Sequence, residues 1–239
     1  MDFFDKYAHN YDFGIESIKY KYYHSIRVKE NMINLAKNLS LPEKDIKLAS
    51  CIGILHDIGR FDQYMLYRSF DDFDFDHGDY ACELIDKLDI LKEYDVDKED
   101  YNVVKAAIRN HNKFAIEPNL THRELLFSKM IRDCDKLDIM YALSSEKLKG
   151  IVNEDEGEIH EDVKNSFFNE EQAVIPKDYT LNDRIVIFFA YVYDINFDII
   201  LNIIKTNNYY NLIYDRLHHQ DLFKPYIDKL NDYLNKRVM

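Results

Sequence analysis

The stretch Ile54-Leu55-His56-Asp57-Ile58-Gly59-Arg60 decides how this chain is interpreted. Its apolar flanks predict that His56 and Asp57 are buried, and an imidazole next to a carboxylate supplies two metal ligands at one point of the chain. A buried His or Asp on its own is more often a core residue with hydrogen-bond partners. Here several groups on inward faces would be costly to bury unless a cation pairs them. The further candidates are His24, His77, His111 and Asp135.

The chain is predicted to be all-α, because it has only 6 Gly and 4 Pro, many strong helix formers and few alternating apolar and polar runs. A long helix is expected over about residues 15–39, with His24 on its apolar stripe. Ser40-Leu41-Pro42-Glu43 has the form of a capping box and predicts a second helix that ends near Gly59. Residues 61–76 are expected to form a loop over the site.

Two further helices are expected over residues 77–88 and 98–111, and they bring His77 and His111 to helix ends. Thr121-His122-Arg123-Glu124 predicts another capping box. The helix after it has an inward stripe that becomes acidic twice, which is unusual for a core. The stripe consists of Phe127, Ile131, Asp135, Asp138 and Ala142.

Three segments are expected to form a single globular unit. Residues 1–149 form the metal-binding helical core, and residues 180–239 form a helical extension that packs on it. Between them, residues 150–179 are rich in Glu and Asp, which predicts an acidic surface insertion or loop, or alternatively a lid.

The formal net charge of −13 argues against duplex nucleic acid or an anionic membrane as a partner. No stretch has the pattern of a signal peptide or the length of a membrane span. Cys51, Cys82 and Cys134 are odd in number, widely spaced and set in apolar helical patterns, which is typical of reduced core thiols. We therefore expect a cytoplasmic protein. The sequence leaves its oligomeric state open.

The order of His24, His56-Asp57 and Asp135 resembles the HD superfamily of metal-dependent phosphohydrolases. The resemblance extends from Tyr22 to Tyr141, and Gly59 and the Asp-Lys-Leu-Asp run at 135–138 strengthen it. It implies an HD-domain-like bundle of about five core helices, with additional C-terminal helices. It also implies that the four residues in this order are metal ligands.

The dinuclear branch of that superfamily, which includes the HD-GYP phosphodiesterases, adds histidines between the central pair and the final aspartate. His77 and His111 stand at such places, which implies a second ion held by these two residues and Asp57. Asn112 replaces the second adjacent histidine of the HD-GYP pattern, and the Gly-Tyr-Pro signature is missing. These departures argue against cyclic di-GMP as the substrate.

The inferred reaction is hydrolysis of a phosphate ester or anhydride by metal-activated water. The candidate catalytic residues are Asp57, Asp138 to orient water or carry its proton, and Arg60 to bind a substrate phosphate. Lys136 and Arg109 are weaker phosphate candidates. One or two divalent ions are expected: Fe, Mn or Mg are favoured, and Zn, Ni or Co remain open.

The favoured function is a phosphohydrolase acting on a small phosphorylated molecule, most simply a nucleotide. One alternative is a metal-containing regulator that binds a nucleotide without cleaving it. Another is a di-iron oxygenase, because the same fold also hosts such enzymes. Phosphate release, ligand-dependent stabilisation without release, and oxygen consumption distinguish the three.

Overall fold

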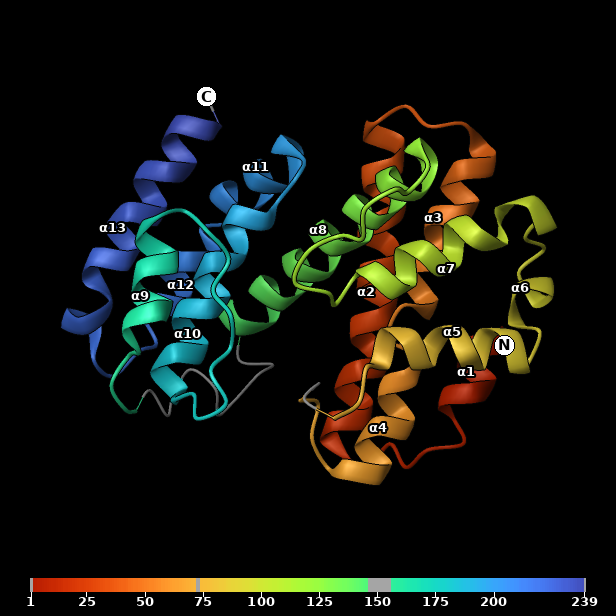
Figure 1. Cartoon of the computed structure of the whole chain (residues 1–239), viewed down its shortest axis with the longest axis horizontal. Coiled ribbons are helices and arrows are strands. Elements are labelled where there is room, and N and C mark those ends of the chain that lie inside the picture. Colours follow the sequence, from red (N-terminus) through yellow and green to blue (C-terminus); the bar gives the residue numbers. More distant parts are fainter. Residues whose placement is uncertain (1, 72–73, 146–155, 239) are drawn as a thin grey trace. The chain divides into compact units, whose positions relative to one another are not determined.

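The computed structural model describes residues 2–71, 74–145 and 156–238, and these residues form helices and loops without strands. The chain divides into two compact units, Met1–Asp135 and Lys136–Met239 (Figure 1). The predicted all-α class is therefore confirmed.

Unit 1 is built around two long helices, α2 (Glu16–Asn38) and α3 (Glu43–Leu55), which lie side by side in Figure 1. Gly53 permits their close approach, since a Cβ atom there would lie 2.7 Å from the Lys29 Cα atom of α2. The buried face of α2 includes Val28 and Met32 as well as His24, as the apolar stripe predicted.

The predicted capping box at Ser40 is wrong. Ser40 has a left-handed backbone conformation with φ of 55° and ends the turn after α2, while Pro42 precedes α3 without a side-chain cap. Helix α3 also ends earlier than expected, at Leu55. His56 is its C-terminal cap residue, and Asp57 lies in the short turn before α4 (Gly59–Tyr67).

The prediction of a loop over residues 61–76 is also wrong, because residues 61–67 belong to α4. Phe61 and Gln63 are fully buried, and Arg68 ends the helix in a left-handed conformation. The short helix α1 (Phe3–Ala8) is tied to α4 through Asp62, which accepts hydrogen bonds from Tyr7 and Tyr11.

The remaining helices of unit 1 agree with the expected ranges, except that the short α6 was not expected. They are α5 (His77–Lys87), α6 (Ile90–Glu93), the 3₁₀ helix η1 (Lys98–Asp100), α7 (Tyr101–Asn110) and the first part of α8 (His122–Ser144). The capping box at Thr121 is confirmed, because the Thr121 backbone N–H donates to Glu124 and the Glu124 N–H donates to the Thr121 hydroxyl.

Unit 2 contains the end of α8 and the helices α9 (Glu161–Phe168), α10 (Leu181–Ala190), η2 (Tyr191–Asp194), α11 (Asp198–Thr206), α12 (Tyr209–Tyr214) and α13 (Gln220–Arg237). Helix α10 begins with a complete capping box between Thr180 and Asp183. Helices α9, α11 and α12 pack on α10 or α13.

The boundary between the two compact units falls between Asp135 and Lys136, inside α8. The expected segments 1–149, 150–179 and 180–239 stay predictions. Within the segment expected to be an acidic insertion, residues 150–155 lie outside the described residues, and α9 buries Val163 and Phe167. At least this part of the segment is helical and contributes to a core.

The three cysteines are buried free thiols, as expected. None of the helices in the described residues is both long enough and apolar enough to span a bilayer.

Candidate metal centre

The ends of several helices bring histidines and aspartates of unit 1 together. Asp57 lies at the centre, in the turn between α3 and α4, and its side chain is only 3% exposed. Around it stand residues from the middle of α2, the C-terminal ends of α3 and α7, the first turn of α5, and α8. These are His24, His56, His111, His77 and Asp135.

The two oxygens of Asp57 face different histidine pairs. Oδ2 lies 3.4 Å from His24 Nε2 and 3.6 Å from His56 Nε2. Oδ1 lies 3.3 Å from His77 Nε2 and 3.5 Å from His111 Nε2. The carboxylate can therefore serve two cations at once, one through each oxygen.

Asp135 completes the group on the Oδ2 side. Its Oδ1 atom lies 3.0 Å from His24 Nε2 and 3.8 Å from His56 Nε2, and its side chain is 17% exposed. Two sets of atoms are close enough to hold an ion, namely those of His24, His56 and Asp135, and those of His56, Asp57 and His111.

The histidine rings point their Nε2 atoms at one another. His77 Nε2 and His111 Nε2 are 2.8 Å apart, and His24 Nε2 and His56 Nε2 are 3.3 Å apart. His56 Nδ1 lies 2.8 Å from the Gly53 carbonyl and His111 Nδ1 lies 2.6 Å from the Ile108 carbonyl. Since a carbonyl only accepts, each Nδ1 donates, and in the neutral form of either ring Nε2 carries the lone pair that a metal ion needs.

The charge state of these groups also suits a cation. Burial lowers the pKa of His111 to about 4, so its ring is neutral at pH 7. Burial raises the pKa of Asp57, but the neighbouring Lys21 and His56 outweigh this effect and hold that pKa well below its usual range. Asp135 likewise has a lowered pKa, because the nearby His24 and His56 rings outweigh the effect of burial. Neutral imidazoles and ionised carboxylates form the donor set that divalent first-row ions accept.

Two positive side chains flank Asp57. Arg60, expected from the sequence, places Nε 3.6 Å from Oδ1. Lys21, which sequence reasoning missed, donates to Oδ2 at 2.7 Å. Its position three residues before His24, on the same face of α2, was the available signal.

The other predicted phosphate residues lie elsewhere. Arg109 pairs with Asp79 on α5, and its side chain is 41% exposed. Lys136 belongs to unit 2, where it pairs with Asp194 at 2.7 Å. Asp138 is buried and also belongs to unit 2, one helical turn after Asp135.

A buried arginine supports the loop after His111. Arg132 on α8 is 1% exposed, and its guanidinium donates to the carbonyl groups of Asn110 at 2.8 Å and Phe114 at 3.3 Å, and also to that of Lys113. These carbonyls belong to the C-terminal end of α7 and the loop after it, where helical partners are lacking. Arg132 therefore fixes the chain at the point where His111 enters the site.

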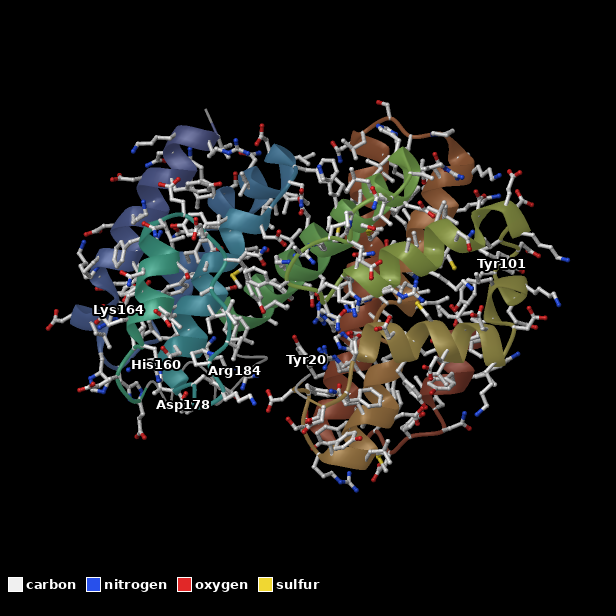
Figure 2. The ribbon with its side chains drawn as sticks, viewed as in Figure 1. Tyr20, Tyr101, His160, Lys164, Asp178 and Arg184 are labelled. Atoms are coloured by element: carbon white, nitrogen blue, oxygen red, sulfur yellow. The ribbon has the colours of Figure 1, made fainter. Side chains whose placement is uncertain are left out.

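A further ring lines the cluster. Tyr20, labelled in Figure 2, stacks on His24 with ring centroids 5.9 Å apart. A separate acidic group, Asp97, Glu99 and Asp100, lies around the Lys44 ammonium, which forms an ion pair with each of the three carboxylates. These ion pairs account for the arrangement of the group.

Comparison with protein families matches residues 22–140 to the HD domain. The chain belongs to the HD superfamily through this segment. All six histidines and aspartates of the cluster lie within the matched residues, and HD domains are generally metal-dependent hydrolases that bind divalent ions. No curated protein and no solved structure matches the chain.

Proposed function

We propose that this HD protein is a phosphohydrolase that uses two divalent ions to cleave a phosphate ester or anhydride of a small phosphorylated molecule, with a nucleotide as the favoured substrate. The observation that carries the proposal is the division of Asp57 between two histidine pairs, one at each oxygen. This arrangement fits a carboxylate that bridges two ions.

The proposed ligands follow from the distances around Asp57. His24, His56, Asp57 and Asp135 would hold the first ion, and His77, His111 and Asp57 would hold the second. Both sets combine imidazole nitrogen with carboxylate oxygen, which favours Fe or Mn and also accepts Mg, Zn, Ni or Co. When bound, such ions lower the pKa of coordinated water and polarise phosphoryl oxygens.

The chain's own residues supply orientation and charge. Arg60 is fixed by hydrogen bonds to the Gln63 side chain at 2.6 Å and the Phe70 carbonyl at 2.7 Å, which suits a group that must meet a phosphate in one orientation. Phe70 is half-buried beside the Arg60 guanidinium and offers a ring face for a nucleobase. Asp138, one turn after Asp135, is our candidate to orient water or carry its proton.

The test is a panel of nucleoside monophosphates, triphosphates and cyclic nucleotides, assayed for phosphate release or ester cleavage with Mn²⁺, Fe²⁺ and Mg²⁺. Wild type is compared with Asp57→Ala and with a matched control, Asp86→Asn, whose exposed carboxylate pairs with Lys105 on the surface of the same unit. We expect turnover by wild type and the control and background rates for Asp57→Ala.

Equal turnover by wild type and Asp57→Ala would overturn the proposal. Thermal stabilisation by a nucleotide without any cleavage would instead indicate a binding protein. Oxygen consumption with a polyol substrate would indicate a di-iron oxygenase.

A further inference from the structure

Lys21 lies beside the proposed metal ligands, although a lysine ammonium does not itself bind a metal ion. Its ammonium group lies 2.7 Å from Asp57 Oδ2, and its side chain is only 13% exposed. It stands one turn before His24 on α2, so its backbone is fixed by the same helix that carries a proposed ligand. A lysine at the rim of the cluster is therefore built into the site.

Lys21 and Arg60 form a pair across one carboxylate. Lys21 approaches Oδ2 and Arg60 approaches Oδ1, so each oxygen of Asp57 has its own cation. Both cations also lie over the ring of Phe70, with Lys21 Nζ 5.2 Å and Arg60 Cζ 5.7 Å from its centroid. The three side chains together present two positive charges and one aromatic ring next to Asp57.

The role of Lys21 depends on whether ions are bound. Ions held at both oxygens of Asp57 would compete with the ammonium for Oδ2 and repel it, because like charges at such separations oppose each other strongly in a buried site. The Lys21 stem is anchored on α2 and keeps the ammonium near the cluster. An anionic substrate group is then the partner that satisfies it.

We propose that Lys21 and Arg60 together bind a terminal phosphate carrying two negative charges, so that the substrate is a phosphomonoester or the end phosphate of an anhydride and not a phosphodiester. This inference rests on the proposed function and narrows its substrate class. Two cations held beside the metal centre match a dianion, whereas a diester offers them only a single negative charge.

The first test is binding of inorganic phosphate to the metal-loaded protein, measured by calorimetry at a pH where the dianion predominates. Lys21→Met should weaken phosphate binding about tenfold, and Lys21→Arg should restore most of it. Lys19→Met, which removes an exposed lysine from another face of α2, is the matched control and should leave binding unchanged. Metal content, measured on the same samples, should equal that of wild type in all three variants.

The second test is kinetic and uses p-nitrophenyl phosphate and bis-p-nitrophenyl phosphate as probes. Wild type should cleave the monoester much faster than the diester, and Lys21→Met should raise KM for the monoester about tenfold with a smaller effect on any slow cleavage of the diester. Equal losses with both probes would overturn the assignment of substrate class.

Two results of the binding test would also overturn the proposal. One is normal phosphate binding by Lys21→Met, and the other is a loss of metal from this variant, which would make Lys21 a structural partner of Asp57. If wild type cleaves no phosphate compound at all, the proposed function fails, while the phosphate titration still decides the role of Lys21.

Discussion

Each unit of this protein buries an aspartate beside histidine, but the two aspartates have different surroundings. In unit 2, Asp183 accepts hydrogen bonds from the backbone N–H groups of Thr180 and His160 and lies 2.6 Å from the His160 ring. In unit 1, Asp57 faces four imidazole Nε2 atoms and the Lys21 ammonium.

The difference separates a structural carboxylate from a candidate metal ligand. The bonds to Asp183 are short and local, and they complete a helix cap that stabilises the start of α10. The contacts to Asp57 with imidazole are longer than 3.2 Å and come from four helices or helix ends. Several imidazole nitrogens directed at one carboxylate form a donor set that a cation can bind.

The largest expected effect on metal content and turnover comes from replacing each of these two aspartates separately. Asp57→Ala should lose bound metal and reduce phosphate release to background, because both proposed ions share this residue. Asp183→Asn should keep the metal and the turnover but lower the free energy of unfolding by about 1–3 kcal/mol, because buried donors lose their partner. Elemental analysis, phosphate release and urea denaturation measure the three quantities. Loss of metal in Asp183→Asn would remove the distinction between the units.

The next largest effect distinguishes the two proposed ions within the metal centre. His24→Ala and His111→Ala should each lose about one ion per chain relative to wild type, because they face different oxygens of Asp57. Elemental analysis of anaerobically purified protein measures this. His122→Ala, which removes an exposed histidine from α8, serves as the control and should keep the full metal content. An unchanged metal content in His111→Ala would reduce the site to one ion and give His111 a supporting role.

A smaller effect on metal affinity is expected when the arginine that holds the chain around His111 is replaced. Arg132→Met should weaken binding of the second ion about 10- to 100-fold, because the carbonyls that fix the end of α7 lose their donor. Metal titration measures the affinity. Arg109→Met is the control, since Arg109 forms a surface pair with Asp79. If Arg132→Met lowers only the unfolding free energy and leaves the affinity unchanged, the arginine supports the fold alone.

The smallest effect is the pH dependence of unit 2. His160, labelled with Asp178 in Figure 2, has a raised pKa because it is hydrogen-bonded to Asp183; Asp178 lies 3.7 Å from its Nε2 atom. Burial raises the pKa of Asp183, but hydrogen bonds from Thr180 and His160 outweigh it and leave the pKa lowered. The histidine therefore stabilises the fold below its ordinary pKa of 6.5, and this contribution is lost as the pH rises through the raised value. The aspartate contributes above its ordinary pKa of 3.8, and its contribution is lost as the pH falls through the lowered value.

The pair should therefore stabilise unit 2 most between these two ordinary pKa values. Melting temperatures from about pH 5 to about pH 8 should fall by a few degrees at most, because water screens the partly exposed ring. His160→Asn should show a flatter profile. An equal slope in wild type and variant would assign the dependence to other groups.

The sequence predicted the all-α class and the helices that carry the cluster because their apolar periodicity is strong. It also brought His24, His56-Asp57, His77, His111 and Asp135 together correctly as a group of inward or helix-end residues. Such positions follow from helical spacing, which a single sequence displays.

The errors have local causes. The Ser40 capping box failed because a left-handed turn after α2 uses the same residue types as a cap. Helix α4 was missed because its aromatic and acidic residues lack a clean apolar period, although Phe61 and Gln63 are buried. Lys21 was missed because its partner, Asp57, is distant in sequence, although its spacing from His24 places it on the same face of α2.

The most direct test of the metal centre is a crystal structure with diffraction data collected at the absorption edge of the bound metal. We predict anomalous peaks on both sides of Asp57, within about 2.0–2.2 Å of the Nε2 atoms of His24 and His56 on one side and of His77 and His111 on the other. Metal-replete crystals with no peak at either oxygen of Asp57, and with the imidazoles hydrogen-bonded to one another, would contradict the account.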